Sequence, residues 1–384
     1  MSHSSPVLRT ESRAPSAAGA VRAAGPRVSE LDGLRGLAIL LVLVFHFTPS
    51  SGPLFFLAHV FQTGWVGVDL FFVLSGYLIT GILLDSVGRP HYYRNFIIRR
   101  SLRIFPLYYA CLLLYGFLTF YPSPIRLGDF LHAGGAAWYL PYLGNVSVFL
   151  QNAWPGAAML TPLWSLQVEE QFYLTFPFIV SAAGRKTLTL ILLASVVTAF
   201  LLRIILTLSL PANQVGTYVL MPCRMDDLAM GGLVAIVQRE RPQWLKQRWI
   251  GWLTGLSAAT FLGVCLLFTV TPWSPVMRTL GFTAAGLMFT GILVMLIGWR
   301  QPFLLALCRL RVLVWLGTIS YGLYLLHIPA LTVVRRWVTP RLGITPDGSA
   351  QLFVSMAVAI AAAALSWWLF ESRVLKLKDR FTVR

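Results

Sequence analysis

Long apolar stretches alternate with short polar gaps along most of the chain. Ten of these stretches have about the length that an α-helix needs to cross the hydrocarbon core of a bilayer. They begin near Leu31, Gly64, Leu102, Leu163, Thr187, Gly216, Trp249, Arg278, Val312 and Ser349. The pattern predicts an all-α, polytopic integral membrane protein with about ten transmembrane helices.

One further apolar segment, residues 129–150, differs from these ten. It is interrupted by His132, Gly134, Gly135, Pro141, Gly144 and Asn145. Irregular backbone is tolerated at membrane depth only where protein or water satisfies its polar groups. We therefore expect a re-entrant or surface segment at 129–150 rather than an eleventh span.

The composition agrees with a membrane protein. Of the 384 residues, 57% are hydrophobic and only 12% are charged, which is too apolar for an ordinary soluble domain. The formal net charge of +17 could suggest a nucleic-acid partner. However, the basic residues lie in the gaps between apolar stretches and no nucleic-acid-binding motif is present, so we expect the lipid bilayer, and no nucleic acid, as partner.

The basic residues also predict which way the chain crosses the membrane. With ten spans, most of the 31 Lys and Arg residues fall on the side that holds both ends of the chain. Because short cytosolic loops are enriched in Lys and Arg, we expect cytosolic N and C termini in the inner (cytoplasmic) membrane.

The domain organisation follows from the same pattern. Residues 1–29 are rich in Ser, Ala, Pro and Arg and predict a disordered basic cytosolic arm without a signal peptide. Residues 30–371 form the predicted membrane domain, and residues 372–384 a short basic cytosolic tail. The four cysteines are scattered and match no metal-ligand or disulfide pattern.

The first predicted span carries two costly polar residues, Arg35 and His46. Eleven residues of α-helix complete about three turns and rise roughly 16 Å, so the two side chains share one helix face. Ionisable groups inside a membrane are functional candidates. The alternative is an interfacial arginine followed by a histidine that is satisfied in the core.

The stretch YYRNFIIRRSLRIFPLYY contains Arg99, Arg100 and Arg103. Arg100 and Arg103 are three residues apart and are neighbours on one helix face. Clustered guanidiniums bind phosphates through bidentate, charge-assisted hydrogen bonds. The stretch predicts a site for an anionic ligand, with anchoring to anionic lipid as the alternative.

Buried acids also need partners. Asp69, in the second predicted span, would cost roughly 2.5–3.5 kcal/mol in lipid without one, and either His46 or Arg224 could pair with it. Arg224 itself lies beside Asp226 and Asp227. These three residues predict a self-neutralising ionic cluster, with substrate binding as the alternative.

Two other stretches place polar groups at helical spacing. Ser165 and Glu169 are four residues apart on one face, whereas Glu170 points about 100° away. Near the end of the chain, SYGLYLLHIP carries Tyr324 and His327. These groups either line a cavity or make structural hydrogen bonds.

Together these stretches resemble the membrane-bound acyltransferase family 3, which includes O-antigen and exopolysaccharide O-acetylases. The matching motifs occur in order, from about Glu30 to Pro329. They are LDGLRGLAILLVLVFH, GVDLFFVLSGYLI, RRSLRIFPLYY, LWSLQVEEQFYL, RMDDLAMG and SYGLYLLHIP. Some members carry an esterase-like domain after the last span, and we expect this chain, which ends at Arg384, to be the single-domain form.

The resemblance implies an acyltransferase that moves an acyl group, commonly acetyl, from cytosolic acyl-CoA to a hydroxyl of a glycan or lipid-linked saccharide. It points to Arg35 and His46 as an essential pair and to Arg100 and Arg103 as a second functional pair. Acetyl-CoA is then a donor substrate, with no permanently bound cofactor and no metal.

These observations combine into a hypothesis for the site. The acyl-CoA phosphates would bind Arg35, Arg99, Arg100 and Arg103. His46 would act as general base or form an acyl-imidazole intermediate.

The remaining candidates have supporting roles in this hypothesis. Glu169 or Asp69 would orient the imidazole, and the substrate-binding groups would be Ser165, Glu170, Tyr324 and His327. The rival hypotheses are a transporter of a lipid-linked glycan or ion that uses the buried carboxylates, and a non-catalytic scaffold.

Overall fold

The computed structural model describes residues 29–120, 136–156 and 158–377. Within these ranges the protein is helical throughout and has no β-strand, apart from one isolated bridge between Ser51 and Gly348. The prediction of an all-α fold is confirmed. Most of the arm at 1–29 and the last residues of the tail lie outside the described residues, and so do residues 121–135.

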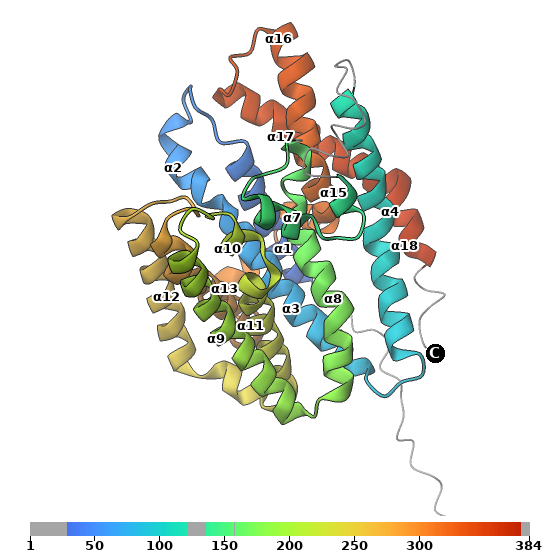
Figure 1. Cartoon of the computed structure of the whole chain (residues 1–384), viewed down its shortest axis with the longest axis vertical. Coiled ribbons are helices and arrows are strands. Elements are labelled where there is room, and N and C mark those ends of the chain that lie inside the picture. Colours follow the sequence, from blue (N-terminus) through green and yellow to red (C-terminus); the bar gives the residue numbers. More distant parts are fainter. Residues whose placement is uncertain (1–28, 121–135, 157, 378–384) are drawn as a thin grey trace, which may run out of the picture.

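In the described part of the chain, ten long helices form the body of the molecule (Figure 1). They are α1 (Ser29–His46), α3 (Gly67–Ser86), α4 (Tyr92–Phe120), α8 (Leu163–Ala182), α9 (Arg185–Ser209), α11 (Met221–Glu240), α12 (Arg248–Leu267), α13 (Phe282–Val294), α15 (Arg311–Val333) and α17 (Ser349–Ser366).

Shorter helices and turns connect or extend these. The α-helices are α2 (Ala58–Phe61), α6 (Ala136–Tyr139), α7 (Gly144–Gln151), α10 (Gly216–Val219), α14 (Pro302–Cys308), α16 (Thr339–Leu342) and α18 (Ser372–Leu377). The 3-10 turns are η1 (Phe55–Leu57), η2 (Gln62–Val66), η3 (Ala158–Leu160) and η4 (Pro242–Lys246), and the π turns are η5 (Met277–Gly281), η6 (Met295–Trp299), η7 (Val334–Val338) and η8 (Trp367–Glu371).

Six helical stretches in the described residues are long and apolar enough to cross a membrane. They are Phe55–Ser86, Arg185–Ser209, Arg248–Leu267, Met277–Trp299, Arg311–Leu342 and Ser349–Leu377. The other long helices, α1, α4, α8 and α11, carry many of the ionisable groups inside the bundle, among them Arg35, Arg100, Glu169 and Arg224. The protein is therefore a multi-pass membrane protein, while the count of ten spans and the side of the termini stay predictions.

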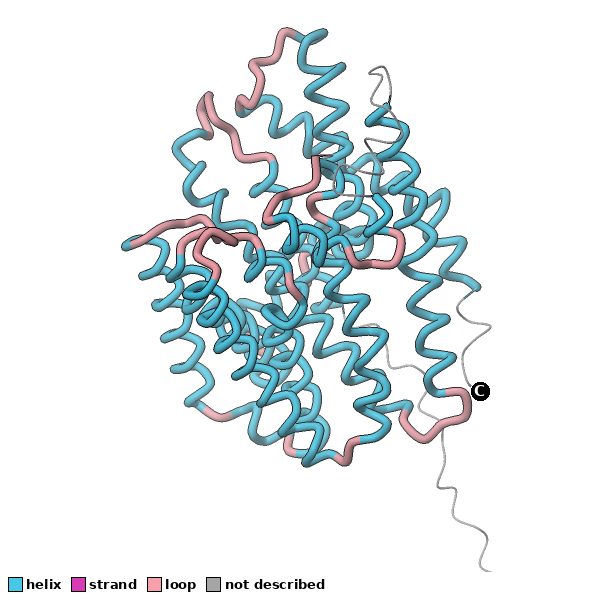
Figure 2. Tube along the Cα trace, viewed as in Figure 1, coloured by secondary structure: helices cyan, strands magenta, loops and turns pink. Residues whose placement is uncertain are grey.

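The helices are arranged around a centre formed by α1, α3 and α15 (Figure 1). Helices α4 and α8 lie on one side of this centre, and α9, α11, α12 and α13 lie on the other. Helix α4 begins and α8 ends at the lower end of the view. Short loops join helices at that end, and longer loops lie higher in the molecule (Figure 2).

Glycines set the closest helix contacts. A Cβ added at Gly36 would lie 2.0 Å from the Leu313 carbonyl oxygen, and one at Gly317 would lie 1.8 Å from the Asp32 oxygen. Helix α1 can approach α15 this closely only because both positions lack a side chain, a common feature of membrane helix interfaces. This contact places the site residues of the two helices beside each other.

The segment at 129–150 is described from residue 136 onward. It contains α6 and α7, neither longer than 8 residues; α7 packs against α8, and α6 packs against α7. The Tyr142 carbonyl accepts a hydrogen bond from Gln171 Nε2 at 3.0 Å, and the Asn145 amide donates to Gln167 Oε1. Two backbone groups of the described part are thus satisfied by side chains of α8, while its re-entrant or surface position stays a prediction.

Candidate functional site

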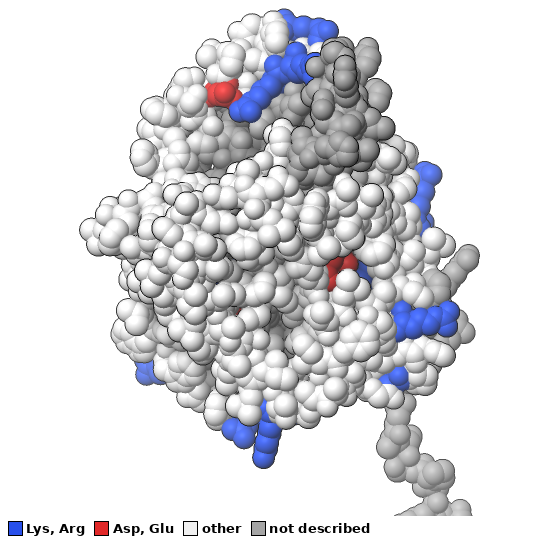
Figure 3. Space-filling view, in the orientation of Figure 1, with Lys and Arg blue, Asp and Glu red and all other residues white. Residues whose placement is uncertain are grey.

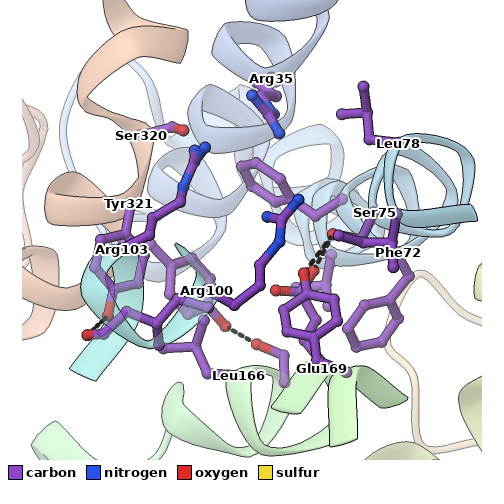
Figure 4. Close-up of a pocket in the computed structure, with 17 residues that line it drawn as sticks. Arg35, Phe72, Ser75, Leu78, Arg100, Arg103, Leu166, Glu169, Ser320 and Tyr321 are labelled. Atoms are coloured by element: carbon purple, nitrogen blue, oxygen red, sulfur yellow. Dashed lines mark hydrogen bonds between the residues drawn. The ribbon is translucent and has the colours of Figure 1, made fainter. Parts of the chain in front are cut away.

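A cavity of about 90 Å³ lies where five helices meet. It is enclosed by α1, α3, α4, α8 and α15 (Figure 4). Its lining residues are Arg35, Val68, Phe71, Phe72, Ser75, Leu78, Ile79, Arg100, Arg103, Ile104, Ser165, Leu166, Glu169, Tyr173, Ser320, Tyr321 and Tyr324. Five separate motifs of the sequence therefore contribute side chains to one space.

Three arginines converge on this cavity. Arg35 enters from α1, and Arg100 and Arg103 enter from α4 (Figure 4). Arg35 makes one long ion pair, 3.4 Å from Nη1 to Asp32 Oδ1. Among the described residues, neither Arg100 nor Arg103 has a carboxylate within 4.0 Å. The cavity therefore holds guanidinium groups whose charge the described part of the protein leaves largely uncompensated.

Glu169 is the one carboxylate among the described lining residues. The Ser75 hydroxyl, from α3, donates a short hydrogen bond to Glu169 Oε1. The Arg100 guanidinium lies 5.4 Å from the ring centroid of Tyr173, within the range of a cation–π contact. With three cations and one carboxylate, the cavity is suited to an anion.

Part of the cavity wall consists of hydroxyl groups from α8 and α15. The Tyr324 hydroxyl lies 2.6 Å from Ser165 Oγ and 2.8 Å from the Pro162 carbonyl oxygen. The Tyr321 hydroxyl donates to the Ile104 carbonyl at 2.6 Å and ties α15 to α4. Ser165 and Tyr324, both predicted to bind substrate, thus meet at the cavity.

The two histidines lie behind this wall. His46 does not line the cavity, but its ring centroid is 4.7 Å from that of His327. His327 is fully buried, and its Nδ1 lies 2.6 Å from the carbonyl oxygen of Tyr324, which does line the cavity. Tyr324, His327 and His46 therefore form a continuous row from the cavity to the end of α1.

Hydrogen bonds to backbone carbonyls indicate which nitrogen carries the hydrogen in each of the two imidazole rings. His46 Nδ1 lies 2.9 Å from the Val42 carbonyl oxygen, so Nδ1 carries the hydrogen and Nε2 keeps its lone pair. The same reasoning holds for His327, whose buried Nε2 has no hydrogen-bond partner in the described part of the chain. The carbonyl of Val42, rather than a carboxylate, orients the His46 ring.

Asp69 lies outside the cavity lining. Arg224 Nη2 lies 2.6 Å from Asp69 Oδ1 and 3.2 Å from Asp227 Oδ2, and Arg203 pairs with Asp226 at 2.7 Å. All five side chains are at most 1% exposed. The structure thus pairs Asp69 with Arg224, one of its two expected partners, and leaves it without a contact to His46.

Two further predicted residues also lie outside the lining. Arg99 is half-buried on α4, beside Arg100. Glu170 is 4% exposed, and its Oε1 has no hydrogen-bond partner among the described residues. The structure therefore brings together most, but not all, of the predicted phosphate-binding and substrate-binding groups.

Several residues of the site were not predicted. Tyr173 lies four residues after Glu169, and the shared helix face could have revealed it. Ser75 resembles a packing residue in the sequence, and no local signal connects it with Glu169. Arg203 sits alone in an apolar helix, and this isolation indicated a buried partner. In the described residues, no group of three His, Cys, Asp or Glu side chains could hold a metal ion.

Comparison with known proteins identifies the family. The model of a family described as "Acyltransferase domain" matches residues 28–371. The peptidoglycan O-acetyltransferase OatA of Listeria monocytogenes is 29% identical over 370 residues, covering 91% of this chain and 56% of OatA. YrhL of Bacillus subtilis, a candidate peptidoglycan O-acetyltransferase, is 30% identical over 331 residues, covering 79% of this chain and 48% of YrhL.

These relatives limit what the match shows. The chain spans about half the length of the curated relatives it matches, and no solved structure matches it. The matched part nevertheless contains α1 to α17 with every residue of the cavity. The family predicted from the motifs is confirmed, and the chain belongs to the acyltransferase family 3.

Proposed function

We propose that this protein is a membrane O-acyltransferase of the cytoplasmic membrane. It moves an acetyl group from cytosolic acetyl-CoA to a hydroxyl of a cell-envelope glycan. Membership of an acyltransferase family and the names of the relatives support this class of reaction. The observation that carries the proposal is that Arg35, Arg100 and Arg103 converge in one cavity, with the two histidines directly behind its wall.

The arginines bind the phosphates of the donor in this proposal. Guanidiniums without carboxylate partners form strong, charge-assisted hydrogen bonds with phosphate oxygens. Arg99, beside Arg100, adds charge at the edge of the cavity. Bound in this way, the donor directs its thioester toward the hydroxyl wall at Tyr324 and Ser165.

His46 acts as the general base. Because His46 lies outside the cavity lining, the thioester must extend past Tyr324 to reach it in this proposal. There the Nε2 lone pair accepts the proton of the acceptor hydroxyl while the hydroxyl oxygen attacks the thioester carbonyl carbon. The carbon–sulfur bond then breaks, and the CoA thiolate takes the proton from the imidazolium. His327 packs against His46 and holds it near the wall formed by Tyr324.

The two acids have different roles. Glu169, held by Ser75, lowers the electrostatic repulsion between the arginines when the donor is absent. Asp69 acts indirectly, because its ion pair with Arg224 fixes α3 against α11 and so positions Ser75. Neither acid needs to touch the imidazole, since Val42 already orients that ring.

A transport function has less support. The acids that suggested it, Asp69, Asp226 and Asp227, each place an oxygen on a buried arginine, as in a structural ion cluster. Such pairs are costly to break, which argues against a relay that must release its ions.

The deciding experiment is a transfer assay. Purified protein in lipid nanodiscs is incubated with radiolabelled acetyl-CoA and with envelope fractions of its host. We expect label in a glycan fraction, released by mild base as for an ester. Binding of acetyl-CoA without transfer to any fraction would contradict the proposed activity, and transport of label without ester formation would support the rival function.

A further inference from the structure

Tyr324 lies between the arginine-lined cavity and the two histidines. Along α15 the lining residues Ser320, Tyr321 and Tyr324 come first, and His327 follows about one helical turn later. Tyr324 belongs to both regions, because its side chain lines the cavity while its carbonyl oxygen lies 2.6 Å from His327 Nδ1. Neither histidine lines the cavity. A thioester whose phosphates are bound by the arginines must therefore pass Tyr324 before it reaches His46.

The side chain of Tyr324 is held in place from α8. Its hydroxyl lies 2.6 Å from Ser165 Oγ and donates to the Pro162 carbonyl at 2.8 Å. Its ring packs edge-on against Phe71 of α3, with 6.3 Å between the ring centroids, and the residue is only 7% exposed. The phenol of Tyr324 therefore forms a closed bridge between α15 and the start of α8.

A second, smaller cavity lies beyond the histidines, and we call it the upper cavity. Phe47, which follows His46, lines it and also packs on His327, with 6.3 Å between the ring centroids. Ser355 lines it as well, and its fully buried Oγ has no hydrogen-bond partner in the described part of the chain. The volume is about 10 Å³, about the smallest that holds a water molecule. Its size and polar lining suit one water.

The upper cavity lies close to the surface of the protein. Two of its lining residues, Arg335 and Asp347, form an ion pair of 2.6 Å, and their side chains are 52% and 44% exposed. Figure 3 shows acidic atoms beside basic atoms at the upper end of the molecule, near α16 in Figure 1. Water thus approaches the histidines from this end, whereas the donor lies on the other side of Tyr324.

We propose that Tyr324 is a gate that determines whether the acetyl group goes to the acceptor or to water. While its hydroxyl is bonded to Ser165 and Pro162, the thioester is kept away from His46. The gate opens when an acceptor hydroxyl takes over these two hydrogen bonds and the phenol swings aside. The other contacts of the acceptor compensate for the bonds that Tyr324 loses, as in induced fit. A water molecule brings no such contacts and leaves the gate closed.

Without a gate, His46 would activate water as well as an acceptor hydroxyl. The water oxygen would bond to the acetyl carbonyl carbon, and the carbon–sulfur bond would break. The proton held by the imidazole would pass to the CoA thiolate, which leaves acetic acid and the CoA thiol as products. This hydrolysis would consume the donor without modifying a glycan. The inference rests on the proposed function and adds to it a residue that determines which nucleophile is used.

The test measures hydrolysis and transfer separately. Protein in nanodiscs is incubated with radiolabelled acetyl-CoA, first alone and then with envelope fractions, and the label is followed into acetate and into glycan ester. Tyr324→Phe keeps the ring and removes the hydroxyl, and Ser165→Ala removes one partner of that hydroxyl. Tyr77→Phe is the matched control. The Tyr77 hydroxyl also ties two helices, through a 2.8 Å hydrogen bond to Gln238 of α11, but Tyr77 does not line the cavity.

Without acceptor, we expect the wild type and Tyr77→Phe to hydrolyse acetyl-CoA equally slowly. Tyr324→Phe should hydrolyse it about tenfold faster or more, because two ordinary hydrogen bonds are lost, with an unchanged KM for acetyl-CoA. Ser165→Ala leaves the bond to Pro162 and should raise hydrolysis less. Adding His46→Ala to Tyr324→Phe should abolish the extra hydrolysis, since that reaction needs the imidazole. A purely structural defect would instead lower turnover and thermal stability together.

Hydrolysis by Tyr324→Phe at the wild-type rate would overturn the gate, and so would extra hydrolysis that persists after His46→Ala. Loss of both hydrolysis and transfer in a folded Tyr324→Phe would overturn it too, because the hydroxyl would then take part in the reaction itself. Rapid hydrolysis by Tyr324→Phe, with no ester formed by the wild type, would support the gate and count against the glycan acceptor alone. Ester formation by the wild type without extra hydrolysis in Tyr324→Phe would leave only the proposed function standing.

Discussion

Two groups of arginines inside the helical bundle differ in burial and in pairing. Arg203 and Arg224 are fully buried, and each is paired with aspartate at 2.6–2.7 Å. The arginines of the cavity are half-buried, and Arg100 and Arg103 have no such partner among the described residues. The first group joins α3, α9 and α11, and the second lines an open space.

The contrast separates structural from functional charge. Separating a buried ion pair leaves an uncompensated charge, which is strongly destabilising. The paired group therefore holds its helices rigidly together. Guanidiniums without partners instead keep their hydrogen-bond donors available for a ligand. Residue type and sequence context alone would not distinguish the two groups, because both are arginines in predicted membrane helices.

The largest expected effect concerns the row of histidines behind the cavity. His46→Ala should lower acetyl transfer by about 10²–10⁴-fold, the usual contribution of a general base. Thermal unfolding should be nearly unchanged, since the substitution leaves no buried charge. A transfer rate within threefold of wild type would exclude His46 as the base, and His327→Gln tests whether its neighbour acts only through packing.

Next, the two groups of arginines should differ in their effect on stability. Arg203→Met leaves Asp226 unpaired and should lower the free energy of unfolding by about 3–5 kcal/mol. Arg103→Met, in the cavity, should change it by less than about 1 kcal/mol. Both changes in the free energy of unfolding can be measured by denaturation in mixed detergent micelles.

A double variant sharpens this stability comparison. Adding Asp226→Asn to Arg203→Met removes the uncompensated charge and should restore part of the lost stability. Equal destabilisation by Arg203→Met and Arg103→Met would show that the contrast between the groups is wrong.

For the affinity of the protein for acetyl-CoA we expect the reverse: an arginine of the cavity should matter, and an arginine in an ion pair should not. Arg100→Ala removes hydrogen bonds to a charged ligand, worth about 1.5–3 kcal/mol, and should raise the apparent KM for acetyl-CoA about 10- to 100-fold. Arg185→Ala, at an exposed ion pair of 3.8 Å with Glu240, is the control and should have no effect. An unchanged KM in Arg100→Ala would refute phosphate binding at this arginine.

The smallest effect should come from Ser75. Ser75→Ala removes a hydrogen bond that holds Glu169, so the carboxylate is freer to turn toward Arg100 and compete with the donor. We expect the KM for acetyl-CoA to rise about 2- to 10-fold, the equivalent of one ordinary hydrogen bond. Ser75→Thr keeps the hydroxyl and should retain most of the affinity, whereas equal losses in both variants would indicate a packing defect.

The helices could be predicted from the apolar pattern because lipid demands a continuous helical backbone. The starts at Leu163 and Ser349 coincide with those of α8 and α17. Helix α4 begins at Tyr92, earlier than the expected start near Leu102, because its arginine-rich first turns are helical and face the cavity. Hydropathy alone treats such charged turns as part of a loop.

The site was predictable where its residues share one helix. Arg100 and Arg103, or Ser165 and Glu169, follow from helical spacing. Contacts between helices were not readable in the same way. The pairing of Asp69 with Arg224 and of His46 with His327 depends on how α3, α11, α1 and α15 pack, and glycines such as Gly76 show close approach without naming the partner helix.

The close packing of α1 on α15 at Gly36 and at Gly317 has a consequence for the histidine pair. Each glycine lies ten residues, roughly 15 Å, before its histidine, on helices that touch through backbone at the glycines. The backbone contact at the glycines thus sets the distance between the two imidazoles from about three helical turns away. Inserting one residue after Gly317 would rotate His327 by about 100° and separate the rings without altering either glycine or either histidine.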